Sequence, residues 1–115
     1  MRILVVDDDS GVRETLSDLL RVAGHSVASA AAYSEAVALL ARPGWDAMVA
    51  DLVLPGGSGL DLAVLARSKG LGAVVCSGHP QRIAQLQSQG IAHLVKPFSA
   101  TALEAALAAV APPGA

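Results

Sequence analysis

The sequence predicts an α/β protein with a doubly wound (βα)5 fold, built on a five-stranded parallel sheet. Five short apolar runs alternate with five longer amphipathic stretches along 115 residues, a length that fits one domain. The runs are continuously apolar, which is typical of strands buried on both faces of a parallel sheet. Right-handed connections then place helices on both faces of that sheet.

The five expected strands share a short run of aliphatic residues, and the second run is the weakest. They are Ile3–Val6, His25–Ala30, Ala47–Ala50, Ala73–Cys76 and Ile91–Val95. Hydrophobic residues make up 53% of the chain but aromatic ones only 3%, so the core must be aliphatic. The single cysteine, Cys76, lies inside the fourth run, and we expect a buried and unreactive thiol.

The stretches between the runs carry apolar residues at helical spacing. In the first helix we expect Ser10 as the N-cap and Gly24 as the stop signal. Each stripe is expected to pack into the core. The stripes are Val12, Leu16, Leu19, Leu20 and Ala23; Tyr33, Val37 and Leu40; Leu60, Val64 and Leu65; Ile83 and Leu86; and Leu103, Leu107 and Val110.

Composition and charge argue against several functions. The net charge is −2 and the eight basic residues are scattered, so nothing favours direct binding of nucleic acid. No apolar run approaches the roughly 18 residues of a membrane helix, and the N-terminus lacks a signal peptide, so we expect a cytoplasmic protein without membrane contact. The domain is expected to span residues 1–111, with 112–115 as a tail or the start of a linker.

Polar residues follow four of the five expected strands, at the end where ligands bind in doubly wound folds. They are Asp7, Asp8 and Asp9 after the first strand, Asp51 after the third, Ser77 after the fourth and Lys96 after the fifth. Taken alone, Asp9 is expected to be a helix N-cap or simply exposed.

Such a cluster of carboxylates needs a compensating positive charge. Mg²⁺ prefers carboxylate oxygens and retains several waters, so it is the natural ligand. Lys96 supplies a mobile ammonium group suited to an oxyanion, and Ser77 supplies a hydrogen-bond donor.

These motifs resemble the receiver domain of bacterial two-component response regulators. The resemblance is carried by Ile3-Leu4-Val5-Val6-Asp7-Asp8-Asp9, Asp51-Leu52-Val53-Leu54-Pro55 with Gly59, Ser77-Gly78 and Lys96-Pro97-Phe98. It runs from Arg2 to about Val110. It implies a flavodoxin-like sheet with strand order 2-1-3-4-5 and, typically, a cis peptide bond before Pro97.

The resemblance also implies the roles of the acidic residues. Asp51 is the expected phosphoacceptor. Asp8 and Asp51 are expected to bind Mg²⁺ directly, Asp7 through water and Val53 through its backbone carbonyl.

Ser77 and Lys96 are expected to hold phosphoryl oxygens, in agreement with the chemistry of phosphoryl transfer. The implied donor is a phosphohistidine of a histidine kinase or a phosphotransfer domain. The output is expected in a separate protein or a further domain, and the only reaction is the protein's own phosphorylation and dephosphorylation.

The sequence departs from the family pattern at three places. His93 stands where the family keeps a Tyr or Phe that switches together with Ser77, and an imidazole there would make the switch sensitive to pH. Only 19 residues separate Ser77 from Lys96, which predicts a short or mobile fourth helix. Val53 and His79 occupy the positions that tune dephosphorylation, and Val53 offers water no hydrogen bond, which predicts a slow reaction.

Three alternatives stay open at this stage. The chain could be a receiver-like module that binds partners without being phosphorylated. Asp7-x-Asp9 also resembles the nucleophile loop of haloacid-dehalogenase-type phosphatases, although Gly11 stands where that loop expects Thr or Val. The third alternative is a flavodoxin-like cofactor binder, against which the carboxylates after the first strand argue. The segment Gly56–Gly59 is expected to be a flexible loop that opens a helix.

Overall fold

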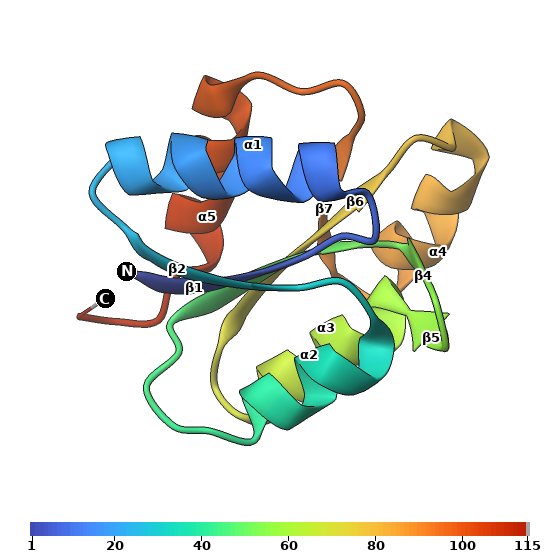
Figure 1. Cartoon of the computed structure of the whole chain (residues 1–115). Helices are drawn as coiled ribbons and strands as arrows, with labels where there is room; N and C mark the ends of the chain where they lie inside the picture. The colour runs from blue at the N-terminus through green and yellow to red at the C-terminus, as the bar shows by residue number, and fades with distance from the viewer. Residues whose placement is uncertain (115) are drawn as a thin grey trace.

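The computed structural model describes residues 1–114, which form a five-stranded parallel sheet flanked by five helices (Figure 1). The strands of the main sheet are β1 (Arg2–Val6), β2 (Ser26–Ala30), β3 (Ala47–Asp51), β6 (Gly72–Ser77) and β7 (Ala92–Val95). The helices are α1 (Ser10–Val22), α2 (Tyr33–Leu40), α3 (Gly59–Ser68), α4 (Ile83–Ser88) and α5 (Ala100–Val110). The sheet order β2-β1-β3-β6-β7 confirms the predicted order 2-1-3-4-5.

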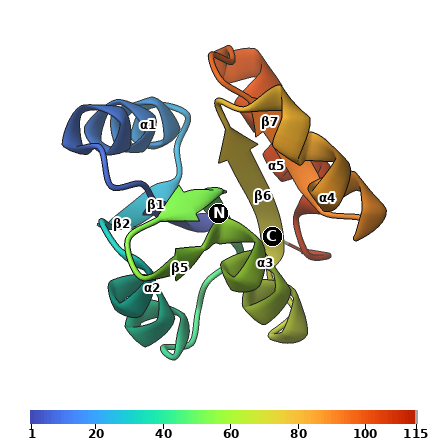
Figure 2. The ribbon, with the colours of Figure 1, turned by 90° about the vertical axis from the view of Figure 1, so that its right-hand side faces the viewer.

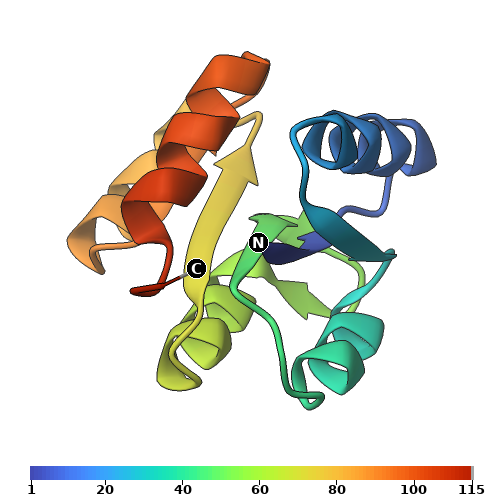
Figure 3. The same ribbon diagram turned by 90° about the vertical axis from the view of Figure 1, so that its left-hand side faces the viewer.

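Helices cover both faces of the sheet, as predicted. Helices α1 and α5 lie on one face, and α2, α3 and α4 lie on the other (Figures 2 and 3). Successive residues of β1 point to opposite faces: Ile3 and Val5 join the core under α1 and α5, whereas Leu4 and Val6 join the core under α2 and α3. This double burial explains why the strand sequences are continuously apolar.

The first helix begins one residue earlier than the sequence suggested. Asp9 is the N-cap, because its Oδ1 accepts a hydrogen bond from the backbone N–H of Val12 at 3.1 Å, and Ser10 is already helical. The prediction of Ser10 as the cap was therefore wrong, whereas Asp9 is both an N-cap and exposed, in line with its two expected roles. Gly24 follows the helix with φ of +97°, which confirms it as the stop residue.

Three of the predicted core residues, Leu19, Ala23 and Val64, are exposed. Leu19 of α1 is 42% exposed and Val64 of α3 is 49% exposed. In α3 the sheet is contacted by Leu62, Ala63 and Ala66, and the two alanines let the helix lie close to the strands. The spacing of the larger apolar residues placed Val64 on the buried face of this helix, which was wrong. In an alanine-rich chain, small residues make many of the contacts with the core.

The expected flexible loop Gly56–Gly59 is ordered instead. Strands β4 (Val53–Leu54) and β5 (Gly57–Ser58) form an antiparallel hairpin around a Pro55-Gly56 turn, in which Gly56 has φ of +81°. Gly57 lies against the ring of Tyr33, with no room for a Cβ atom. The backbone N–H of Tyr33 also donates to the carbonyl of Pro55 at 3.2 Å. These contacts between distant segments hold the hairpin and were not visible in the local sequence.

The fourth helix is short, as predicted. Helix α4 has six residues and follows a 3-10 turn, η1 (Pro80–Arg82). Only Leu86 of this helix is fully buried. Arg67 of α3 donates from Nη1 to the carbonyl of Gln89 at 3.2 Å and so ties the end of α4 to its neighbour.

Helix α5 ends at Val110, just before the predicted boundary of the domain at residue 111. The boundary and the tail of residues 112–115 stay a prediction, and Ala115 lies outside the described residues. In residues 1–114, every helix is too short or too polar to span a lipid bilayer.

Candidate functional site

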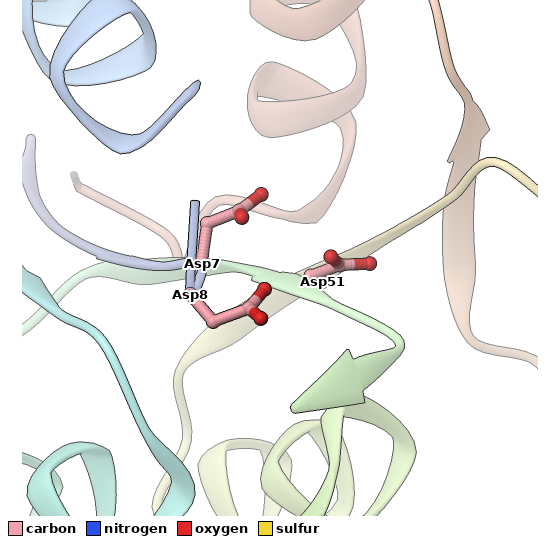
Figure 4. Close-up of side chains that lie close together, drawn as sticks. All are labelled: Asp7, Asp8 and Asp51. Carbon is pink, nitrogen blue, oxygen red and sulfur yellow. The ribbon is translucent and has the colours of Figure 1, made fainter. Parts of the chain in front are cut away.

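The carboxyl ends of β1 and β3 bring three acidic side chains together. Asp7 and Asp8 follow β1, and Asp51 is the last residue of β3, as Figure 4 shows. One carboxylate oxygen from each of the three lies within 4.8 Å of the others. The exposure differs, because Asp7 is buried, Asp51 is partly buried and Asp8 is exposed. Adjacent parallel strands thus place these residues as the sequence predicted.

Lys96 reaches this cluster from the end of β7. Its Nζ donates to Asp7 Oδ2 at 3.0 Å and to Asp51 Oδ2 at 3.4 Å. The backbone N–H of Lys96 donates to the carbonyl of Ser77 at 2.9 Å, which extends the pairing of β7 with β6. The Lys96–Pro97 peptide bond is cis, as the resemblance implied. One ammonium group therefore joins two of the three carboxylates.

Burial and charge act against each other on these groups. Burial raises the pKa of Asp51, the ammonium of Lys96 lowers it, and the carboxylate of Asp7 raises it, with a net upward shift. For Lys96, burial favours the neutral form, but the hydrogen bond to Asp7 and the charges of both acids outweigh burial and raise its pKa. Lys96 thus stays charged at neutral pH. The pKa of Asp51, in contrast, stays raised by burial and by the neighbouring carboxylate of Asp7.

Ser77 ends β6 beside the cluster, but its hydroxyl is engaged elsewhere. Its Oγ accepts from the backbone N–H of His79 at 3.0 Å and donates to the carbonyl of His79 at 3.3 Å. Both bonds close the turn after β6. Ser77 is 1% exposed, so a change of its hydrogen bonds has to involve the His79 backbone.

The other predicted site residues lie around this rim. The side chain of Val53 is 49% exposed at the start of β4, and His79 is exposed in the turn after β6. His93 is partly buried in β7, and its Nδ1 lies 3.2 Å from the carbonyl of Ile91, in donor range. The imidazole of His93 is therefore occupied locally and makes no hydrogen bond to Ser77.

The loop between β3 and α3 explains the spacing of Gly59 from Asp51. Gly59 opens α3 and its N–H donates to the carbonyl of Leu52 at 2.8 Å. A Cβ atom at Gly59 would overlap the carbonyl group of Asp51. Only glycine lets the helix begin directly against the backbone of Asp51.

Arg13 is a contributor that the sequence analysis missed. It lies in the first turns of α1, and its Nη1 donates to the backbone carbonyl of Asp7 at 2.8 Å. The only sign of this contact in the sequence is an arginine one helical turn after the acidic run. No spacing rule predicts that a long side chain will bond a carbonyl six residues earlier.

The buried cysteine lies under this cluster. Cys76 is 1% exposed and pairs in register with Asp51. Burial raises the pKa of its thiol to about 12, with a smaller opposing effect of Lys96. The expectation of a buried thiol is confirmed, and at neutral pH the thiol stays protonated.

The three carboxylates form a donor set suited to a hard divalent cation. Lys96 offsets part of the charge of Asp7 and Asp51, whereas Asp8 makes no ion pair among residues 1–114. An exposed carboxylate next to a buried and a partly buried one gives Mg²⁺ oxygen ligands while leaving room for waters. The residues present therefore fit the magnesium ion that the resemblance implied.

Comparison with known proteins identifies the family. The response regulator receiver domain model matches residues 3–108. The chain belongs to this family, and it is thus a receiver domain of two-component signalling. This assignment decides against the phosphatase and the cofactor-binding alternatives.

Among curated proteins, the chain is 39% identical to response regulator MprA of Mycobacterium leprae over 115 residues, covering 96% of this chain and 49% of that protein. It is 34% identical to response regulator protein FleR of Pseudomonas aeruginosa over 107 residues, covering 89% of this chain and 23% of that protein. The chain thus spans half or less of the length of these relatives.

Solved structures share the fold. Response regulator TrrA of Thermotoga maritima, solved in complex with Mg(2+)-BeF, is similar with a TM-score of 0.85 and 28% identity, covering 95% of this chain and 97% of that one. A CheY-like receiver domain from Methylobacillus flagellatus has a TM-score of 0.84 and 27% identity, covering 96% and 98%.

The raised pKa of Asp51 makes a prediction about stability. A raised pKa means that folding favours the protonated carboxyl. The charged form of Asp51 therefore opposes folding above its folded-state pKa, and this effect declines as the pH falls and vanishes below the unfolded-state pKa. We expect Asp51→Asn to raise the melting temperature of the metal-free protein by a few degrees at pH 7, and by less as the pH falls toward 4. Calorimetry over this pH range measures it.

Asp61→Asn is the matched control, because it removes the same charge from a residue that is exposed in the first turn of α3. No gain is expected there. Equal gains in both variants, or a gain at Asp51 that is independent of pH, would contradict the explanation.

Proposed function

We propose that this domain takes a phosphoryl group from a phosphohistidine onto Asp51, with Mg²⁺, and thereby changes its partner-binding surface. The observation that carries the proposal is the position of Asp51, whose carboxylate lies beside two further acids and 3.4 Å from the Lys96 ammonium. A nucleophile, a metal site and a cation for the transferred group thus lie together. Such an arrangement provides what phosphoryl transfer requires, namely positioning and neutralisation of charge.

The metal site in this proposal uses the acids with different roles. Asp8 and Asp51 would bind Mg²⁺ directly, Asp7 would act largely through water, and Val53 would contribute its backbone carbonyl. The full burial of Asp7 and its bond to Lys96 support the indirect role. When bound, the ion offsets the negative charge between the carboxylates and the phosphoryl oxygens.

In the transfer step, a carboxylate oxygen of Asp51 attacks phosphorus. A P–O bond forms as the P–N bond of the phosphohistidine breaks, and the imidazole leaves with the electron pair of that bond. Lys96 pairs with one phosphoryl oxygen, and Ser77 donates to another after releasing the His79 backbone. Hydrolysis of the acyl phosphate later restores Asp51, so the domain acts only on itself.

The partners follow from this chemistry. The donor is a histidine kinase or a histidine phosphotransfer domain. A groove of about 650 Å³ between α1 and the start of α5 lies directly beside Lys96 and offers such a protein an apolar surface, including the exposed Leu19 and the ring of Phe98. The curated relatives are longer than this chain, which supports an output carried by another domain or by a separate protein.

Direct phosphorylation is the main test. The domain is incubated with a small phosphodonor such as acetyl phosphate and Mg²⁺, and its intact mass is measured. We expect the gain of one phosphoryl group, with loss of the adduct in Asp51→Asn and without Mg²⁺. No adduct with any donor would favour the alternative of a binding module that is never phosphorylated, and an adduct retained in Asp51→Asn would place the acceptor elsewhere.

The switch is proposed to use Ser77 and His93. Phosphorylation would draw the Ser77 hydroxyl from the turn toward Asp51, and His93 lies on β7, which pairs with β6 at its register partner Val75. We expect the imidazole resonances of His93 to shift on phosphorylation in an NMR experiment, whereas those of His25, at the far end of β2, stay unchanged. Equal shifts of both rings, or none at His93, would contradict this switch.

Self-dephosphorylation is proposed to be slow. Val53 presents an apolar side chain, 49% exposed, where a hydrolytic water would need orientation, and His79 is the other residue placed to modify access. We expect Val53→Asn to shorten the lifetime of the phosphoryl group several-fold, as followed by intact mass after removal of the donor. Val64→Asn is the matched control, because Val64 is also 49% exposed but lies on α3.

Loss of phosphate from the wild-type domain too fast for manual sampling would contradict the slow reaction. A lifetime that changes equally in both variants would show an effect of surface polarity rather than of position.

A further inference from the structure

Every polar group of Asp7 takes part in a hydrogen bond. Its backbone N–H donates to the carbonyl of Ala30 at 3.1 Å, and its Oδ1 accepts from the N–H of Asp9 at 3.0 Å. Its Oδ2 accepts from Lys96 at 3.0 Å. Its carbonyl accepts from Arg13 at 2.8 Å. The side chain of Asp7 is thus fixed by two donors, and its outgoing peptide group is fixed by Arg13.

The peptide group that Arg13 holds is the one that leads into Asp8. Because a peptide bond is planar, the Asp7 carbonyl and the Asp8 N–H turn together. Fixing that carbonyl therefore fixes the plane from which the Asp8 side chain departs. Asp8 has no other such support, since it is exposed and forms no ion pair in the described part of the chain.

Arg13 bonds a backbone carbonyl instead of a carboxylate. It pairs with no carboxylate within 4.0 Å among residues 1–114, although Glu14 and Asp18 lie on the same helix. A guanidinium donating to a carbonyl forms a charge-assisted bond, which is stronger than one from a neutral donor. Its positive charge also lies next to the acidic cluster, where by itself it would weaken binding of a cation.

We propose that Arg13 is a positioning residue, which holds the Asp7–Asp8 peptide plane so that Asp8 faces the metal site. The inference rests on the proposed function only in naming Mg²⁺ as the ligand. The two effects of Arg13 have opposite signs on metal affinity. Loss of positioning weakens Mg²⁺ binding, whereas loss of the positive charge alone strengthens it, so the direction of change separates them.

The first measurement is Mg²⁺ affinity by calorimetric titration of the unphosphorylated domain. We expect Arg13→Met to weaken binding on the order of tenfold, at the lower end of what losing a residue that supports metal ligands costs. Arg13→Lys should recover part of the loss, because an ammonium can still donate to the Asp7 carbonyl. Unchanged or tighter binding in Arg13→Met would overturn the proposal.

Arg21→Met is the matched control. Arg21 also lies on α1 and donates to a strand carbonyl, that of Val27 at 3.4 Å, but far from the acids. Its replacement removes the same charge, a comparable contact to a carbonyl and an exposed ion pair with Asp18 at 3.5 Å, so Mg²⁺ affinity should stay at the wild-type value. Equal losses in both variants would overturn the positioning role and indicate general loosening of α1.

The second measurement does not require metal or phosphate. We expect NMR order parameters of the Asp8 and Asp9 amides in the metal-free protein to fall in Arg13→Met and not in Arg21→Met. If the wild-type domain neither bound Mg²⁺ nor accepted phosphate, the proposed function would fail, yet this result would still decide the role of Arg13. Unchanged order parameters would overturn the inference whatever the phosphorylation assay shows.

Discussion

The Lys96 ammonium is the interaction on which the site depends. Three carboxylates lie within 4.8 Å at the ends of two strands, and Lys96 is the cation that pairs with two of them. Its partners lie 89 and 45 residues away in the sequence, so the contacts exist only when the sheet is complete. Because β6 separates β7 from β3, the lysine side chain has to pass the end of β6 to reach Asp51 and Asp7.

Lys96 offsets only part of the negative charge of the three carboxylates. Lys96 bonds Asp7 more closely than Asp51, and the pKa of Asp51 stays raised because burial and Asp7 act against it. One ammonium faces three acids, and a bound divalent cation would offset the remaining negative charge. The charged form of Asp51 therefore opposes folding. Arg13 adds support through the backbone instead of adding another ion pair, which keeps Asp8 available.

The sequence predicted the sheet and the acidic cluster because both follow from local rules. Continuous apolar runs mark buried parallel strands, and residues directly after such strands meet at one edge. Other features depend on contacts that local rules do not contain. The hairpin at Gly57 needs the ring of Tyr33, the face of α3 is set by Ala63 rather than Val64, and Arg13 reaches back across a helical turn. In each case a small residue or a long side chain determines the contact, and neither produces a periodic pattern in the sequence.

The three aromatic residues of this domain have structural roles, which bears on the proposed switch. Tyr33 covers Gly57, Trp45 donates to the carbonyl of Leu39 and stacks on Arg2, and Phe98 lines the groove beside α1. Each has a structural task away from the Ser77 hydroxyl. In the proposed switch, a change at Asp51 would therefore act through the Ser77–His79 turn and the edge strand β7. The next element along that turn is α4, which has one fully buried residue and one arginine contact to α3. Elements with so few buried side chains open most easily, so α4 is the segment on which we expect a change in the Ser77–His79 turn to act.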